Sequence, residues 1–396
     1  MQAELARARD MIARGEFAEA DAVLSVLRAR APTDINVLNL ATVLALRTGD
    51  DAAASDYSAQ AFGMLPEHPT IRANRVLALT RAASASLKTG ACNDAAHAAI
   101  QVLQIDPHAG AARSVLLQAA IAAASAGQTP LPDVADWPAG AMPSLSVVTC
   151  SIDSAKQARF EASLQAHFAG VDLELLVIND ARSLAEAYAR GLAGTSHPYV
   201  LFCHDDIAFA RPDFAPRLFS ALQQFDLVGV AGCTRLTGPS ALWSGPGHAF
   251  CQIGQRDPSG QLLASLYGLG AERIGGAMAL DGVFLACHRS VATQVGFDAD
   301  RFDHFHLYDT DFSYRAHLAG YRVGIAQDLL LIHDSLGNFD ARWQAQADRF
   351  LAKFPALAGN PADPERILLA PIAEHELLAV YTELRAWLNP LFPNAI

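Results

Sequence analysis

A histidine and two aspartates end one short apolar segment of the chain. The segment YVLFCHDDI covers residues 199–207, and His204, Asp205 and Asp206 follow five mostly apolar residues. On a β-strand, side chains two residues apart project to the same side, so the imidazole of His204 and the carboxylate of Asp206 can share one divalent ion. Such an ion, with open positions left, neutralises a diphosphate leaving group. The alternative is a polar cluster that satisfies only itself.

Four short apolar runs alternate with helical segments from residue 144 onward. They are LSVVTCS (145–151), LELLVIND (173–180), YVLFCHDD (199–206) and DLVGVAGC (226–233). Near-continuous apolar strands alternating with helices predict an α/β domain with a parallel sheet covered on both faces. Ligands of such sheets bind at the carboxyl ends of the strands. Polar residues gather at those ends: Thr149, Ser151, Asn179, Asp180, His204, Asp205 and Asp206. No GxGxxG follows the first strand, which disfavours a dinucleotide fold.

A pattern of about 34 residues repeats near the N-terminus. GEFAEA (15–20), GDDAAA (49–54) and GACNDA (90–95) are each followed by a proline twelve residues after the last alanine. The third copy is displaced by seven further residues near TRAASAS. A small residue at a turn, another at a helix crossing and a proline after the second helix resemble tetratricopeptide (TPR) repeats. Residues 110–127 are expected to form the capping helix. Such arrays present a concave surface to a peptide or partner helix, and the alternative is a passive support.

These patterns divide the chain into four parts. We expect a TPR-like domain of three repeats and a capping helix at 1–126, a proline-rich linker at 127–143, an α/β domain at 144–358 and a C-terminal helical extension at 359–396. The extension contains a candidate amphipathic helix, which would close the site or form a dimer contact. A homo-oligomer is therefore left open.

Charge and hydropathy exclude several classes of partner. The formal net charge is −12 with a pI near 5.5, which argues against nucleic acid and anionic membranes because both need clustered positive charge. No run approaches the roughly 20 apolar residues that span a bilayer, and the start MQAELARARDM lacks a secretory signal. We therefore expect a cytoplasmic protein. Its six cysteines are far apart, which predicts free thiols.

Residues 144 to about 355 resemble a glycosyltransferase of the GT-A fold, a Rossmann-like nucleotide-diphospho-sugar transferase, in the inverting family 2 group. YVLFCHDDI occupies the place of the family's Asp-x-Asp motif, and INDARSLAEAYARGL is similar to the segment before it. FDADRFDHFHLYDTDFSYRAHLAGYRVGIAQDLLLIHDS matches the acidic motif, its helix and a late histidine. The resemblance covers about half of the chain, and several motifs occur in the family's order.

The resemblance implies a divalent metal held by three side chains. Asp206 matches the metal-coordinating aspartate, and His204 replaces the motif's first aspartate as a second ligand or as a contact to the diphosphate. His333 matches a distal histidine that is the third ligand in some relatives, with a capped core histidine as the alternative. Asp205 would face the ribose. Because imidazole is a softer ligand than carboxylate, manganese is favoured over magnesium.

The resemblance also implies a general base. YDTDFSYR matches the family's Glu-Asp motif, with Tyr308 where glutamate is common. Asp309 would remove the acceptor hydroxyl proton while that oxygen attacks the anomeric carbon opposite the diphosphate. A plain helix N-cap is the alternative for Asp309. Asp281 would lie near the donor sugar and acceptor, with Gly282 allowing close backbone approach. Asp311 is expected to cap the helix or pair with a cation.

The remaining candidates would contact the nucleotide and the acceptor. The base and ribose would be held by Thr149, Ser151, Asn179 and Asp180, with Tyr188 packed nearby. Trp243 would stack on a sugar ring, and the alternative is a packing role. His304 and His306 suggest a His-x-His metal centre of the hydrolase kind, but the loop before the acidic motif accounts for both.

Three functions follow for the whole chain. The first is an inverting, metal-dependent hexosyl- or N-acetylhexosaminyl-transferase that uses a UDP-, dTDP- or GDP-linked sugar and a protein acceptor recruited by the repeats. The second keeps the chemistry but glycosylates a surface polysaccharide or lipid-linked glycan. The third is a non-catalytic TPR scaffold with a degenerate transferase fold. The loss of the motif's first aspartate favours the scaffold, whereas the joint presence of Asp206, Asp281, Asp309 and His333 favours an enzyme.

Overall fold

The structure is a computed structural model that describes residues 1–127, 129, 134–135, 137, 141–337, 339–359, 362 and 364–392. The chain divides into two compact units, Met1–Ala123 and Ala124–Ile396. Most of the predicted linker at 127–143 lies outside the described residues. Each unit is described by itself below.

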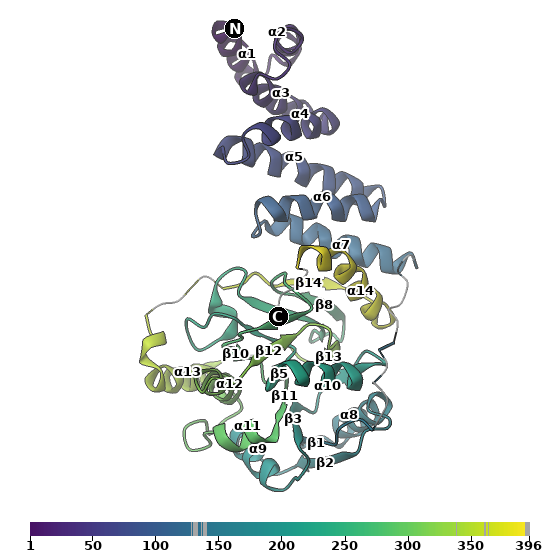
Figure 1. Cartoon of the computed structure of the whole chain (residues 1–396), viewed down its shortest axis with the longest axis vertical. Helices are drawn as coiled ribbons and strands as arrows, with labels where there is room; N and C mark the ends of the chain where they lie inside the picture. The colour runs from purple at the N-terminus through teal and green to yellow at the C-terminus, as the bar shows by residue number, and fades with distance from the viewer. Residues whose placement is uncertain are drawn as a thin grey trace. The chain divides into compact units, whose positions relative to one another are not determined.

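The N-terminal unit is a TPR-like array of antiparallel helices (Figure 1). Its helices are α1 (Gln2–Arg14), α2 (Phe17–Arg30), α3 (Ile35–Thr48), α4 (Asp51–Met64), α5 (Pro69–Lys88), α6 (Cys92–Ile105) and α7 (Gly110–Ser125), the last of which crosses the boundary between the units. The predicted TPR-like array is thus confirmed, and the capping role of α7 stays a prediction. The inserted residues of the third repeat lengthen α5 to 20 residues, against 13 for α1 and 14 for α3.

The repeated sequence markers have the structural roles that their types require. The first glycine of each marker adopts a positive φ at a helix end, which glycine tolerates best: Gly15 (81°), Gly49 (80°) and Gly90 (77°). The last alanine of each marker is completely buried: Ala20, Ala54 and Ala95. Small side chains at these positions allow the helices of each pair to pack closely. The glycines and alanines of the markers thus account for the turns and for the close helix packing of the array.

The second unit contains a seven-stranded mixed sheet with the order β2-β1-β3-β11-β5-β12-β9. Its strands are β1 (Leu145–Cys150), β2 (Leu173–Ile178), β3 (Tyr199–His204), β5 (Leu227–Gly229), β9 (Arg273–Gly275), β11 (Phe284–His288) and β12 (Val323–Ala326). β1, β2 and β3 are parallel, as predicted, but β11 runs antiparallel to both β3 and β5. The strands expected from the four apolar runs therefore run in one direction, and the sheet is mixed because β11 runs the other way. Between β5 and β11 the chain forms four strands of the second sheet and then returns through β11 in the opposite direction.

A second sheet lies against the carboxyl end of β3. Its order is β10-β6-β7-β13-β4, and β8 pairs with β7 and with β14. The strands are β4 (Ile207–Phe209), β6 (Ala231–Cys233), β7 (Ala249–Arg256), β8 (Leu262–Leu266), β10 (Ala279–Leu280), β13 (Leu331–His333) and β14 (Leu368–Pro371). The predicted strand at 226–233 is thus two strands, β5 and β6, in different sheets.

Helices cover both faces of the first sheet. Alternate residues of its strands therefore pack into two separate hydrophobic cores. In β3, Val200 and Phe202 join one core, whereas Leu201 and Cys203 join the other. The first core includes α9 (Leu184–Ala193), α11 (Arg289–Val295), α12 (Tyr308–Leu318) and α13 (Ala341–Lys353). The second includes α8 (Ser154–His167) and α10 (Phe214–Gln224). Short 3-10 helices occur at Ala241–Ser244, Pro355–Leu357, Glu374–Glu376 and Asn389–Leu391.

The C-terminal segment packs onto the second sheet. β14 pairs antiparallel with β8, and α14 (Leu377–Leu388) follows it. The buried hydroxyl of Tyr381 lies 2.8 Å from the Ile253 carbonyl oxygen and 2.7 Å from that of Ser265. The predicted C-terminal helix is therefore anchored to β7 and β8. Whether it closes a site or forms a dimer contact stays a prediction.

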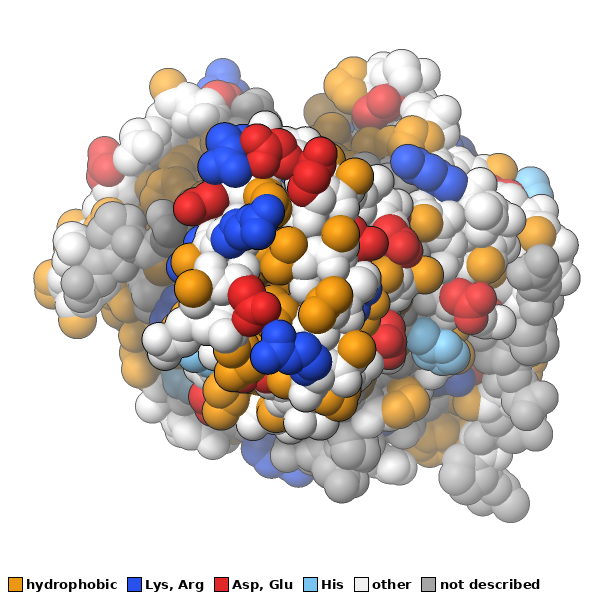
Figure 2. Space-filling view, turned by 90° about the horizontal axis from the view of Figure 1, so that it is seen from above, with side chains coloured by type: hydrophobic (Ala, Val, Ile, Leu, Met, Phe, Trp, Pro, Cys, Tyr) orange, Lys and Arg blue, Asp and Glu red, His pale blue; other side chains and the backbone are white. Residues whose placement is uncertain are grey.

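The described surface offers neither a basic patch in the view shown nor a membrane-spanning helix. On the face in Figure 2, Lys and Arg side chains are interspersed with Asp and Glu side chains, and apolar side chains lie among them. Among the helices of the described residues, none is both long enough and apolar enough to cross a bilayer.

Candidate active site

Strand register brings the polar residues at the ends of β1, β2 and β3 together. Cys150, the last residue of β1, is paired with Ile178 on one side and with His204 on the other. Two further pairings bring distant segments to the same edge. β13 pairs with β4 so that His333 lies opposite Ile207, and β11 pairs with β3 so that Phe284 lies opposite Cys203.

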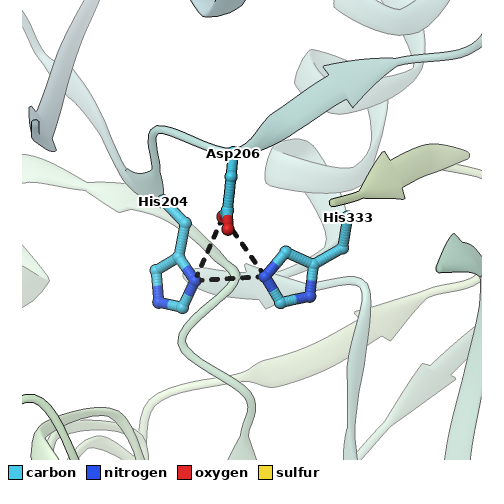
Figure 3. A group of neighbouring side chains, drawn as sticks. All are labelled: His204, Asp206 and His333. Carbon is cyan, nitrogen blue, oxygen red and sulfur yellow. Dashed lines mark hydrogen bonds and ion pairs between the residues drawn. The ribbon is translucent and has the colours of Figure 1, made fainter. Parts of the chain in front are cut away.

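His204, Asp206 and His333 form a compact group at this edge (Figure 3). His204 Nδ1 lies 3.4 Å from His333 Nε2, and Asp206 Oδ1 lies 3.3 Å from His333 Nε2 and 3.9 Å from His204 Nδ1. The three ligand atoms all lie within 4.8 Å of one another. In Figure 3 the side chains point toward one another, His204 and Asp206 from the end of β3 and the turn after it, and His333 from the end of β13. The structure thus brings together the three residues that the sequence suggested as metal ligands.

The donor set and spacing fit a divalent cation. Ligand atoms about 2.1 Å from one ion, at right angles to each other, lie roughly 3 Å apart. The three separations here, 3.3 to 3.9 Å, are slightly wider, so only a small contraction would be required. Two imidazoles and one carboxylate leave further coordination positions open. Among the described residues, this is the one set of three or more His, Cys, Asp or Glu side chains whose ligand atoms lie close enough to hold one ion. Neither His304 nor His306 belongs to it.

Asp206 is held as an anion. Its burial opposes ionisation, but the hydrogen bond and charge of His333, with smaller contributions from His204 and Lys156, hold the pKa of the carboxyl well below its usual range. Lys156 Nζ lies 3.5 Å from Asp206 Oδ2. Ser335 Oγ lies 3.0 Å from His333 Nε2. Burial, together with the nearby His333, lowers the pKa of His204 and favours the neutral imidazole that a metal needs.

The first turn of α12 carries Asp309 against the turn between β10 and β11. The backbone N–H of Gly282 donates to Asp309 Oδ2 at 2.7 Å, and Asp281 Oδ1 accepts from the Val283 N–H at 2.9 Å. Burial, followed by the negative charge of Asp281, raises the pKa of Asp309 to about 7. A half-buried carboxylate with this pKa is suited to take up a proton near neutral pH.

Gly282 is required by the closeness of this packing. A Cβ built on Gly282 would lie 2.9 Å from the Cβ of Asp309 and 2.6 Å from Cζ of Tyr308, and it would overlap the Tyr308 hydroxyl. The close backbone approach expected from the sequence is therefore present. It is made to the first turn of α12.

A second polar group lies beside the metal-ligand candidates. Ser151 Oγ donates to Asp205 Oδ2 at 2.6 Å, and Asn179 Nδ2 donates to the Ser151 carbonyl oxygen at 2.7 Å. These three residues come from the ends of neighbouring parallel strands, where the register predicts that they meet. Asp180 is mostly exposed and forms an ion pair with Arg190 of α9.

Thr149 and Tyr188 are completely buried, so neither offers its side chain to a ligand in this structure. Both hydroxyls donate to the carbonyl oxygen of Cys203, at 2.9 Å and 3.1 Å. Both residues therefore support the end of β3, and a contact of Thr149 with the nucleotide stays a prediction. Trp243 packs edge-to-face on Trp343 with 5.5 Å between ring centroids, which agrees with its alternative role in packing.

Three residues near the site escaped the sequence reasoning. Tyr308 was noted only as a departure from the family pattern, yet its hydroxyl lies 3.1 Å from His204 Nε2. Lys156 and Ser335 contact the metal-ligand group from loops or helix starts. Lysine and serine are common at such positions, so no sequence signal singles them out. Asp311 is buried and paired with Arg315 and Lys353, which confirms its expected charge pairing.

Comparison with known proteins agrees with this geometry. The sequence model of a glycosyltransferase-like family matches residues 146–354, more than half of the chain. The chain belongs to this glycosyltransferase family, and the matched glycosyltransferase domain lies in its second unit, after an all-helical region. The match includes every residue of the metal-ligand group and the Asp281–Asp309 pair. No curated protein matches the chain significantly in sequence.

Several solved structures resemble the chain at low identity. A mutant O-GlcNAc transferase from Thermobaculum terrenum is 17% identical over 44% of this chain and 36% of its own, with a TM-score of 0.22. A mannosyltransferase from Pyrobaculum calidifontis, solved with GDP-Man and Mn²⁺, is 14% identical over 80% and 84%, with a TM-score of 0.36. GalNAc-T7, solved with UDP, GalNAc and Mn²⁺, is 11% identical over 63% and 56%, with a TM-score of 0.34. The chain thus spans about a third of the first of these proteins.

Proposed function

We propose that the protein transfers a sugar from a nucleotide-sugar donor to an acceptor by an inverting, metal-dependent reaction. The observation that carries the proposal is the convergence of His204, Asp206 and His333 beside the turn of α12 that holds Asp309. A cation site and a proton acceptor side by side are what a single displacement at the anomeric carbon requires.

The three ligand candidates would hold one divalent cation, which supplies positive charge to the departing diphosphate. Asp206 provides the anionic ligand, because its carboxyl stays ionised throughout the neutral range. His204 and His333 provide neutral nitrogens. Two imidazoles favour manganese over magnesium, which prefers oxygen ligands.

Asp309 would accept the proton of the acceptor hydroxyl. Its Oδ2 is fixed by the Gly282 N–H, and the two carboxylate oxygens have further acceptor positions for a proton. Asp281, exposed at the same turn, would bind the sugar or acceptor hydroxyls. An attack assisted by this carboxylate from the side opposite the diphosphate gives inversion at the anomeric carbon.

The nucleotide would lie along the ends of β1 and β2. Ser151, Asn179 and Asp205 are linked by hydrogen bonds there, and the Asp205 carboxylate is a suitable acceptor for ribose hydroxyls. Asp180 is accessible to the base, although it is paired with Arg190. We include UDP-, dTDP- and GDP-linked sugars as candidate donors.

The experiment is calorimetric titration of UDP, dTDP and GDP into the full-length protein with Mn²⁺, Mg²⁺ or chelator. We expect one nucleotide to bind with a metal, Mn²⁺ giving the tighter binding, and to lose that binding in Asp206→Ala. The matched control is Asp257→Ala, because the described bonds of Asp257 stay within its own turn. Metal-independent binding, or no binding by folded wild type, would overturn the proposal.

We further propose a protein acceptor, because the TPR-like array is of a kind that holds peptides or partner helices. Recruitment of a polypeptide by the array would raise its effective concentration for the transferase. The test incubates full-length protein with radiolabelled donor and a cell extract, and then separates proteins, polysaccharides and lipids. Label in the protein fraction supports the proposal. Label only in polysaccharide or lipid contradicts it and identifies the other acceptor class.

A further inference from the structure

The two positions at which this chain departs from the family pattern contact each other. His204 replaces the first aspartate of the Asp-x-Asp motif, and Tyr308 stands where glutamate is common. They are 104 residues apart in sequence, yet His204 Nε2 lies 3.1 Å from the Tyr308 hydroxyl oxygen. A candidate metal ligand and a residue of α12 are therefore joined by a hydrogen bond in this chain.

The surroundings of the Tyr308 hydroxyl determine which partner donates. This hydroxyl is buried and also lies 3.2 Å from the carbonyl oxygen of Gly282. A carbonyl oxygen can only accept, so the single hydroxyl proton is directed to Gly282. The hydroxyl oxygen then accepts a proton from His204 Nε2. The Tyr188 hydroxyl also contacts the Tyr308 hydroxyl, but its own proton goes to the Cys203 carbonyl oxygen. The arrangement gives both the Gly282 carbonyl oxygen and the His204 Nε2–H a hydrogen-bond partner.

The other nitrogen of His204 faces the metal-ligand group. Nδ1 lies 3.4 Å from His333 Nε2 and 3.9 Å from Asp206 Oδ1. In a neutral imidazole with its proton on Nε2, Nδ1 carries the lone pair. The nitrogen that must bind a cation is therefore the one that the tyrosine contact leaves unprotonated.

We propose that Tyr308 is a positioning residue that holds His204 in the Nε2–H tautomer and aims its Nδ1 lone pair at the metal position. The metal part of this inference rests on the proposed function. The tautomer itself does not, because it follows from contacts within the chain.

Tyr308 is itself tightly fixed. It follows Leu307, whose φ of 62° is the one positive value among non-glycine residues of the described chain, and its ring packs edge-to-face on Tyr188 at 5.5 Å. Gly282 leaves the room that the hydroxyl occupies. A glutamate at 308 could accept from His204 Nε2, but its carboxylate would then face the carbonyl oxygen of Gly282 with no proton to share. Tyrosine satisfies both partners.

The test reads the tautomer directly in metal-free, full-length protein. Histidine labelled with ¹⁵N gives distinct nitrogen shifts and long-range couplings for the two tautomers, and His204→Gln identifies the signal among the 13 histidines. We expect wild-type His204 to be protonated at Nε2 only. In Tyr308→Phe, which keeps the ring but removes the acceptor, we expect a mixture of both tautomers.

The second readout is Mn²⁺ affinity, measured by the electron paramagnetic resonance of free Mn²⁺. Loss of an outer-shell partner typically costs 10–100-fold in metal affinity, and we expect a loss of about that size in Tyr308→Phe. Tyr381→Phe is the matched control, because it also removes a buried hydroxyl bonded to two backbone carbonyls, and those carbonyls belong to Ile253 and Ser265 rather than to the turn at Gly282. We expect it to change stability and to leave both readouts unchanged.

The outcomes separate the two proposals. Wild-type His204 protonated at Nδ1, or a tautomer and an affinity that Tyr308→Phe leaves unchanged, overturns the role of Tyr308. If wild type binds no Mn²⁺, the metal site of the proposed function fails, and the tautomer still decides the role of Tyr308. The wild-type spectrum needs no variant, so a Tyr308→Phe protein that does not fold would leave that decision intact.

Discussion

Asp206 and Asp309 are two carboxylates of one site in opposite environments. Around Asp206 lie two imidazoles and the ammonium of Lys156, and these hold the pKa of its carboxyl well below the usual range. Beside Asp309 lies another carboxylate, Asp281, and burial together with that charge raises the pKa of Asp309 to about 7. One is a permanent anion suited to a cation, and the other can take up a proton near neutral pH.

This difference teaches how one fold assigns two roles to one residue type. Pairs of titratable groups whose environments push their pKa values apart indicate acid, base and binding roles. Tyr308 lies between the two regions, in contact with His204 on one side and adjacent to Asp309 along the chain. The predictions below test the comparison by removing one contribution at a time.

Asp309→Asn should have the largest effect. The amide keeps the shape of the side chain but cannot take up the acceptor proton, so we expect kcat to fall by about 10²–10⁴-fold. Donor and metal binding should stay near wild type, because Asp309 belongs to neither group of proposed ligands. Steady-state transfer assays and calorimetry check the two halves. A variant that loses donor binding but keeps kcat would assign Asp309 to binding.

The same substitution has a signature in stability. Because the folded state raises the pKa of Asp309, it holds a proton that the unfolded chain releases above pH of about 4. The contribution of Asp309 to the free energy of unfolding is therefore fully present below that pH and is lost as the pH rises through about 7. Urea unfolding of Asp309→Asn between pH 5 and 8 should lack this loss.

Gly282→Ala should have the next largest effect, through packing. The added methyl group would overlap the Tyr308 hydroxyl and press on Asp309, so we expect a cost of about 1–3 kcal/mol in the free energy of unfolding. Both the Tyr308 contact and the Asp309 position would shift, so activity should fall together with Mn²⁺ affinity. Urea unfolding and Mn²⁺ titration measure these changes. Gly63→Ala is the control, since a Cβ there meets nothing within 4 Å. Unchanged stability would contradict the packing argument.

Asp281→Asn should move the pH profile. Wild-type kcat/KM should fall as the pH drops through about 7, because Asp309 becomes protonated. Removing the neighbouring charge lowers the pKa of Asp309, so the acidic limb should move to lower pH by up to about 1 unit. Its height should also drop if Asp281 contacts the sugar or acceptor. The decisive measurement is the pH at the midpoint of the acidic limb, with Asp257→Asn as the control. An unmoved limb would mean that the charge of Asp281 does not raise the pKa of Asp309.

The sequence predicts the ends of the parallel strands, where Asp206 lies, better than it predicts the surroundings of Asp309. Residues at the ends of β1, β2 and β3 follow from apolar runs and strand register, which are local properties, and Ser151, Asn179 and Asp205 do meet as predicted. The glycines and alanines of the repeats also follow from a local pattern, and the structure places them at helix ends and in the core. The contact of Tyr308 with His204 depends on how α12 packs on the turn between β10 and β11, which no local pattern specifies. The antiparallel entry of β11 was missed for the same reason.

Lys156→Met should have the smallest effect, with opposite signs for the two ligands. Lys156 is partly exposed and 3.5 Å from Asp206 Oδ2, and such pairs contribute about 0.2–1 kcal/mol. Its ammonium competes with a cation for the Asp206 carboxylate but attracts a diphosphate. We therefore expect Mn²⁺ to bind up to about fivefold more tightly, and the nucleoside diphosphate to bind more weakly by a similar factor. Calorimetry of each ligand alone, with exposed Arg159→Met of the same helix as control, separates the two effects. If both affinities move in the same direction, Lys156 acts on the shape of the site, and the electrostatic contrast between Asp206 and Asp309 would then rest on the two histidines.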